Sequence, residues 1–128
     1  MKVSIFSQRN VTDPVIVDKL FEELGKYEEP VIFLTGGAHG AQQVVYDALK
    51  DDYDFVVFKP WTQISKKLES LAIVDGKFDP TFFFYRNIQI VDNSDLVVIF
   101  DNKEKDAECY KVKNLCEKKD KNMVIINV

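Results

Sequence analysis

Short apolar runs alternate with amphipathic segments along most of the chain. The runs predict strands. In the segments between them, apolar residues recur at the spacing of one face of a helix, which predicts helices. The expected strands cover residues 2–7, 31–34, 55–58, 95–100 and 123–128, and the expected helices cover residues 14–24, 41–50, 81–91 and 106–119. Strands that alternate with helices in this way predict βαβ units. We therefore expect an α/β fold, a Rossmann-like three-layer sandwich with a mainly parallel sheet of about five strands.

The length of 128 residues is typical of one domain, so residues 1–128 are expected to form a single unit. No apolar run is long enough to cross a bilayer, and the first residues lack the pattern of a signal peptide. The expected location is therefore cytoplasmic, with no membrane contact. Residues 61–80 form the least regular stretch, and the role of the insertion at 62–80 stays open.

A glycine-rich turn, Thr35-Gly36-Gly37-Ala38-His39-Gly40, joins the second strand directly to the second helix. Glycines let backbone amides approach a ligand, and the start of the helix offers free N–H groups and partial positive charge. This arrangement suits the phosphate of a nucleotide-like ligand. It is neither a Walker loop nor a GxGxxG motif, and a tight turn without a ligand is the alternative.

Arg86 and Asn87 follow a dense aromatic run, Phe82-Phe83-Phe84-Tyr85. An arginine among apolar neighbours needs a partner for its charge. A phosphate or carboxylate of a ligand would satisfy it, and the alternative is an ion pair with Asp92 or Asp95.

The remaining composition narrows the choice of partner. The net charge of −4 argues against nucleic acid, which is normally bound by a basic surface. The one His and the two Cys lack the spacing of a zinc site, so no metal and no cofactor are expected. Cys109 and Cys116 are interpreted as buried or half-buried thiols.

The order of these motifs resembles a known family. The chain resembles the YspA-like branch of the SLOG superfamily in four successive features. These are GGAHGA after the second strand, Pro60-Trp61 after the third, Arg86-Asn87 on a helix, and the strand SDLVVIF. The resemblance spans nearly the whole chain. It implies a Rossmann-like protein that binds a nucleotide or a nucleotide-derived, phosphorylated ribosyl ligand as a sensor or sequestering protein, and a possible homodimer or other homo-oligomer.

The resemblance also assigns site residues. Gly36, Gly37 and Gly40 would cradle the phosphate, Arg86 would neutralise it, and Asn87 would shape the site. Trp61 would pack beside a base or ribose. The ligand-binding set that we expect from the motifs and the resemblance together is Ser7, Gly36, Gly37, Ala38, Gly40, Gln42, Trp61, Arg86 and Asn87.

Two departures from the family pattern leave other functions open. Gln42 replaces the family acid, and the second glycine-rich turn is absent after the fourth strand. Glu108 begins the following helix, where superfamily members that cleave N-glycosidic bonds carry a catalytic Glu. Hydrolysis or (deoxy)ribosyl transfer by Glu108 is therefore one alternative. A DNA-related role is another, and a protein-interaction domain with a degenerate site is the last.

Overall fold

The computed structural model describes residues 1–58, 73–74, 77–78 and 81–128. Pro60, Trp61 and most of the insertion at 62–80, all named above, lie outside the described residues.

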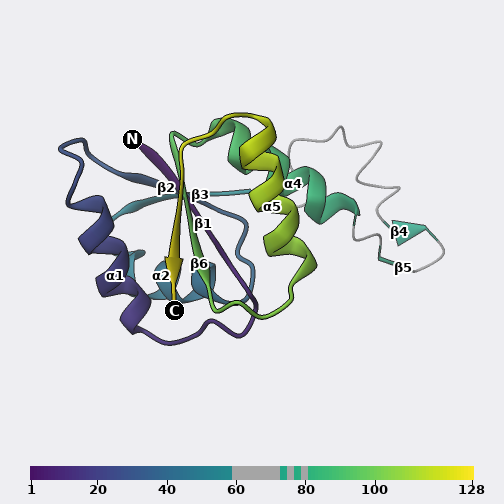
Figure 1. The fold of residues 1–128 in the computed structure, drawn as a ribbon, viewed down its shortest axis with the longest axis horizontal. Helices are drawn as coiled ribbons and strands as arrows, with labels where there is room; N and C mark the ends of the chain where they lie inside the picture. Colours follow the sequence, from purple (N-terminus) through teal and green to yellow (C-terminus); the bar gives the residue numbers. More distant parts are fainter. Residues whose placement is uncertain (59–72, 75–76, 79–80) are drawn as a thin grey trace.

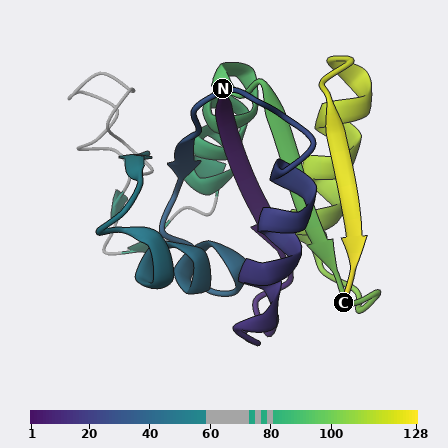
Figure 2. The ribbon, with the colours of Figure 1, turned by 90° about the vertical axis from the view of Figure 1, so that its left-hand side faces the viewer.

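Five parallel strands form one sheet. In spatial order they are β3 (Asp54–Val57), β2 (Ile32–Thr35), β1 (Lys2–Ser7), β6 (Leu96–Asp101) and β7 (Met123–Asn127). Figure 2 shows β1, β6 and β7 running in the same direction. The predicted α/β fold with about five mainly parallel strands is therefore confirmed. A separate two-stranded antiparallel pair, β4 (Ile73–Val74) with β5 (Lys77–Phe78), was not predicted.

Helices cover both faces of the sheet, which gives three layers (Figure 1). The helices α1 (Val15–Leu24) and α2 (Ala41–Leu49) pack on one face, and α4 (Thr81–Asn93) and α5 (Ala107–Lys118) pack on the other. All six residues of β6 are buried, as expected for a central strand covered on both faces. Each face has its own apolar core, one beneath α1 and α2 and one beneath α4 and α5.

The helix ends follow the sequence signals closely. Helix α1 starts one residue later than predicted, after Pro14, although Asp13 still accepts a hydrogen bond from the amide of Val15 (3.0 Å). It ends at Gly25 as expected. Asp106 caps α5 by accepting from the amide of Cys109.

Both cysteines are free and buried, which confirms the interpretation made from their spacing. Burial raises the pKa of Cys109 and Cys116 to about 11, so both thiols stay protonated at neutral pH.

Candidate functional site

The carboxyl end of the sheet, where all five parallel strands end, gathers most of the polar residues singled out above. Parallel strands place the turns that follow them side by side. The turns after β1 and β2 and the start of α5 after β6 therefore meet at one end of the molecule. The strand order reverses direction between β1 and β6, and ligands of open α/β sheets bind beside such a switch point.

The glycine turn, residues 35–40, is held in shape by the side chain of Gln42. Its Oε1 accepts hydrogen bonds from the amides of Gly36 (3.1 Å) and Ala38 (3.0 Å). Its Nε2 donates to the carbonyl of Ile5 in β1 (2.8 Å). Two amides that could have met a phosphate therefore already have an acceptor within the chain, and the turn is preorganised by a neutral side chain.

The three glycines of the turn serve different purposes. A Cβ on Gly36 would lie 2.5 Å from Nε of Arg86, so this glycine makes room for the guanidinium. Gly40 has a φ of +99° and lies against the carbonyl of Gln8, where a Cβ would come within 2.5 Å. Gly37 has a φ of +71°, and a Cβ placed there would meet no atom of the described residues within 4 Å. Gly37 is thus the glycine of this turn that faces open space.

The first turn of α2 follows the glycine turn directly. Ser7 at the end of β1 accepts a hydrogen bond from the amide of Ala41 (2.8 Å) and so caps the helix from a neighbouring strand. The amides of Gln42 and Gln43 have no acceptor among the described residues. First-turn amides carry the partial positive charge of the helix, so this end of α2 retains the capacity to bind an anion.

Arg86, Asn87 and Glu108 form a second group, here called the Arg86 cluster. Arg86 is 3% exposed, and its Nη1 donates to the carbonyl of Gly36 (3.3 Å). Its Nε and Nη2 donate to Oδ1 of Asn87, and Nη2 lies 3.5 Å from Oε1 of Glu108. Asn87 in turn donates to the same Glu108 oxygen (2.8 Å). The cluster ties α4 and α5 to the glycine turn.

The ion-pair alternative weighed for Arg86 named the wrong acids. Its carboxylate partner is Glu108, whereas Asp92 pairs with Lys119 and Asp95 accepts from the amide of Lys2. Sequence proximity suggested an acid on or just after the same helix, while the parallel sheet brings the start of α5 beside α4. Burial lowers the pKa of the Arg86 guanidinium, and the nearby Glu108 carboxylate partly counters this.

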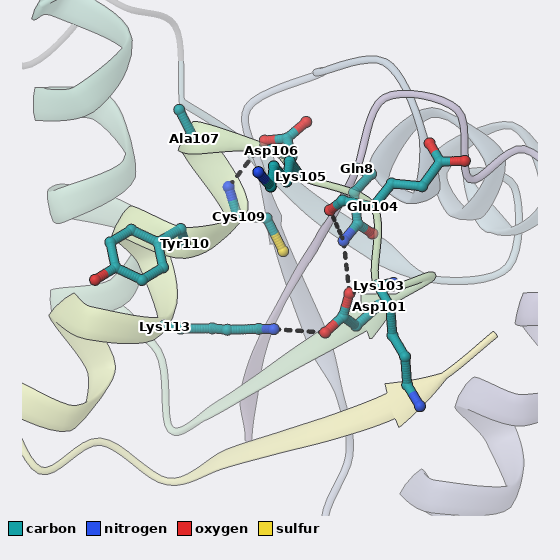
Figure 3. Close-up of a pocket in the computed structure, with 10 residues that line it drawn as sticks. All are labelled: Gln8, Asp101, Lys103, Glu104, Lys105, Asp106, Ala107, Cys109, Tyr110 and Lys113. Carbon is teal, nitrogen blue, oxygen red and sulfur yellow. Dashed lines mark hydrogen bonds and ion pairs between the residues drawn. The ribbon is translucent and has the colours of Figure 1, made fainter.

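A pocket of about 500 Å³ lies beside the switch point (Figure 3). We call it the switch-point pocket. Gln8 donates to Oδ1 of Asp101 (2.6 Å) and accepts from the amide of Asn102, and Lys113 donates to Oδ2 of Asp101 (2.5 Å). The hydrogen bond from Lys113 is the main cause that lowers the pKa of Asp101 to about 2. Sequence reasoning missed Gln8 and Lys113, which carry no motif.

The expected ligand-binding residues fall into two adjoining groups. The first surrounds the start of α2 and the second is the Arg86 cluster, and the carbonyl of Gly36 joins them through Arg86. The first group contains Ser7, Gly36, Gly37, Ala38, Gly40 and Gln42. Glu108 joins the second group, as a catalytic role would require, although its carboxylate is engaged there by Arg86 and Asn87.

Comparison with known proteins identifies a shared fold. A structure of DNA processing protein A from Helicobacter pylori, solved to explain its single-stranded DNA binding mode, matches with a TM-score of 0.65 and 19% sequence identity. The two share a fold. The match covers 98% of this chain and 64% of that chain, so this chain corresponds to less than two thirds of its neighbour. No family model matches the chain, and no curated protein matches it.

This neighbour corrects one expectation. The expectation from net charge that nucleic acid is not a partner is contradicted, because a protein with this fold binds single-stranded DNA. A net charge of −4 averages over the whole chain and does not describe the charge at one end of a sheet. The YspA-like branch of the SLOG superfamily stays a prediction.

Two absences concern the described part of the chain. No group of three or more His, Cys, Asp or Glu residues is arranged there to hold a metal ion. None of the helices in that part combines the length and apolar character needed to cross a membrane.

Proposed function

We propose that this chain binds a nucleotide-type ligand, free or within a single strand, with a phosphate at the start of α2. The observation that carries the proposal is the convergence of three features at the carboxyl end of the sheet. These are the first-turn amides of α2 that lack an acceptor among the described residues, the open glycine Gly37 and the buried positive charge of Arg86. Amides and a helix dipole that are fixed before binding favour an anion without a large ordering cost.

The proposal gives Arg86 a different role from the neutralisation of the phosphate that the resemblance implies. Its guanidinium is occupied by the carbonyl of Gly36, by Asn87 and by Glu108. It therefore supports the phosphate site from behind the glycine turn, as a positioning residue. The direct contacts are assigned to the amides of Gln42 and Gln43, because the amide of Gly37 already donates to Oγ1 of Thr35 (3.2 Å).

The ligand of this proposal can be a free nucleotide or a nucleotide within a strand. Single-stranded DNA is bound by the neighbour named above, which extends the nucleotide hypothesis to nucleic acid. Phosphate recognition by backbone amides carries no sequence information, so the same contacts serve a mononucleotide and a strand. Both are therefore tested in one experiment.

An N-glycosidic enzyme is the second candidate, because Glu108 lines a pocket between α4 and α5 and is linked to the glycine turn through Arg86. Its Oε1 is held by Arg86 and Asn87. In enzymes that cleave N-glycosidic bonds, a carboxylate beside the anomeric carbon acts as a nucleophile or stabilises an oxocarbenium-like transition state. Release of free base from a nucleoside monophosphate by the wild-type protein, lost in Glu108→Gln, would support this candidate.

The test changes charge at His39, which is exposed beside Gly37 on the glycine turn. Because it is exposed, His39→Glu and His39→Lys leave the core unchanged. An added negative charge near a phosphate costs about 1 kcal/mol in a water-like medium, or about fivefold in affinity. His39→Glu should therefore weaken binding of adenosine monophosphate and of a short single-stranded oligonucleotide, and His39→Lys should strengthen it.

The matched control places the same charge at the opposite end of the sheet. Asn122→Glu lies just before β7, is exposed, and should leave both affinities unchanged. Binding measured by fluorescence polarisation at fixed salt separates these outcomes. Equal weakening by His39→Glu and Asn122→Glu would indicate general repulsion and would refute a phosphate site at α2. No binding of either ligand would favour the protein-interaction domain.

A further inference from the structure

A small pocket between α4 and α5 adjoins the Arg86 cluster. It encloses about 220 Å³ and is here called the interhelical pocket. Its walls are largely apolar and include Phe84, Val112 and Leu115. Polar groups enter at the end where Asn87 and Glu108 meet, at the carboxyl end of the sheet. Apolar walls with a few convergent polar groups are typical of a ligand site, and this volume suits a single flat ring system.

The pocket is joined to the glycine turn by one guanidinium group. Arg86 donates through Nη1 to the carbonyl of Gly36 and faces Glu108 through Nη2. The phosphate site and the polar end of the pocket therefore lie on two sides of the same side chain.

We propose that the interhelical pocket holds the base of the ligand and that Glu108 selects bases that carry an amino group. This inference rests on the proposed function, because it assumes that a nucleotide binds at this end of the sheet. It assigns Glu108 to recognition of the ligand rather than to bond cleavage.

The hydrogen bonds of Glu108 determine the selectivity. Its Oε1 accepts from Asn87 and faces Arg86, while Oε2 has no partner in the described part of the chain. The Glu108 side chain is 39% exposed, and it lines the pocket. An ionised carboxylate can only accept hydrogen bonds. The exocyclic amino groups of adenine and cytosine can donate a hydrogen bond to it. The O4 carbonyl of thymine, at the corresponding position, is itself an acceptor and cannot.

The walls of the pocket supply contacts that do not depend on the base. Phe84 is 37% exposed and offers an aromatic face, and stacking on aromatic rings tolerates every base. The ammonium of Lys111 lies 5.7 Å from the centroid of the Phe84 ring and makes the rim cationic. The pocket should therefore bind all bases by stacking and rank them by the hydrogen bond to Glu108.

The experiment measures base preference in wild type and Glu108→Gln. The probes are fluorescein-labelled dA, dC and dT hexamers, with adenosine, cytidine and thymidine monophosphates as unlabelled competitors. Wild type should prefer adenine and cytosine over thymine by about five- to tenfold, the effect of one good base contact. Glutamine both donates and accepts, so Glu108→Gln should reduce this preference to less than about twofold by improving thymine binding.

Two further variants keep the test decisive. Glu117→Gln removes an exposed carboxylate near the other end of α5 and should leave the preference intact. Phe84→Ala should weaken all bases by about tenfold without changing their order. Phe84 is partly exposed, so this variant remains informative even if Glu108→Gln fails to fold.

The outcomes separate this inference from the proposed function. Equal binding of all bases by wild type, with sensitivity to His39→Glu retained, would overturn the inference and leave the proposed function standing. A uniform loss across bases in Glu108→Gln would also overturn it, because Glu108 would then act only through the fold. Release of free base would make Glu108 a catalytic residue and overturn it as well. Failure of every probe to bind would overturn both proposals.

Discussion

The substitution Gly36→Ala tests how the glycine turn and the Arg86 cluster depend on each other. A Cβ at this position would lie 2.5 Å from Nε, 2.6 Å from Cζ and 2.9 Å from Cδ of Arg86. The φ of Gly36 is not positive, so the backbone itself accepts alanine. Any cost therefore comes from the contact with Arg86 alone.

The guanidinium cannot retreat without losing its partners. It is buried, and it is held by the carbonyl of Gly36, by Asn87 and by Glu108. Overpacking of this kind costs about 2 kcal/mol of unfolding free energy. Urea denaturation resolves this difference, and the melting temperature should fall by several degrees.

Two comparisons isolate the cause. The Cβ of Gly37→Ala would meet no described atom within 4 Å, so this variant should cost about 1 kcal/mol, from its positive φ alone. In an Arg86→Ala background the clash is gone, so Gly36→Ala should cost less than about 0.5 kcal/mol. An equal cost for Gly36→Ala in both backgrounds would refute the claim that this glycine exists to admit Arg86.

Three further predictions concern the hydrogen bonds at the carboxyl end of the sheet. Gln42→Leu removes the acceptor of two turn amides and should lower the free energy of unfolding by about 3 kcal/mol, with faster hydrogen exchange in the turn. The exposed Gln43→Leu should change neither quantity, and unchanged exchange in both variants would contradict the role of Gln42. Ser7→Ala removes the acceptor at the start of α2 and should cost about 1 kcal/mol in urea denaturation, and wild-type stability would contradict the capping role. The pKa of Asp101 is depressed to about 2, so the stability it contributes is present above its ordinary value of 3.8 and is lost as the pH falls toward 2. Lys113→Met should therefore destabilise the protein at neutral pH and converge with wild type near pH 2, and a difference that persists unchanged at pH 2 would contradict this.

Much of the fold could be predicted because the elements carry strong local signals. The apolar run that forms β6 is buried on both faces, α1 ends at Gly25, and Asp106 caps the start of α5. Element boundaries differ by a residue or two, as at the start of α1. The antiparallel pair β4–β5 was missed because strands of two residues leave no periodicity to detect.

The candidate site could be predicted only in part. The glycine turn was found because it joins a strand directly to a helix, and Arg86 was found because a charge among aromatic residues requires a partner. The identity of that partner, Glu108, depends on how the sheet brings α4 and α5 together, which local sequence does not encode. The engagement of the turn amides by Gln42 depends likewise on side-chain geometry.

Nuclear magnetic resonance tests the central claim most directly. Amide ¹⁵N–¹H correlation spectra can be titrated with adenosine monophosphate and with a short single-stranded oligonucleotide. A phosphate at the start of α2 predicts that the largest shifts fall on the amides of Gln42 and Gln43, which lack an acceptor among the described residues, with none at Asn122 on the opposite end of the sheet. Shifts confined to that opposite end, or no saturable shifts with either ligand, would contradict the claim that this chain binds a nucleotide-type ligand at its glycine turn.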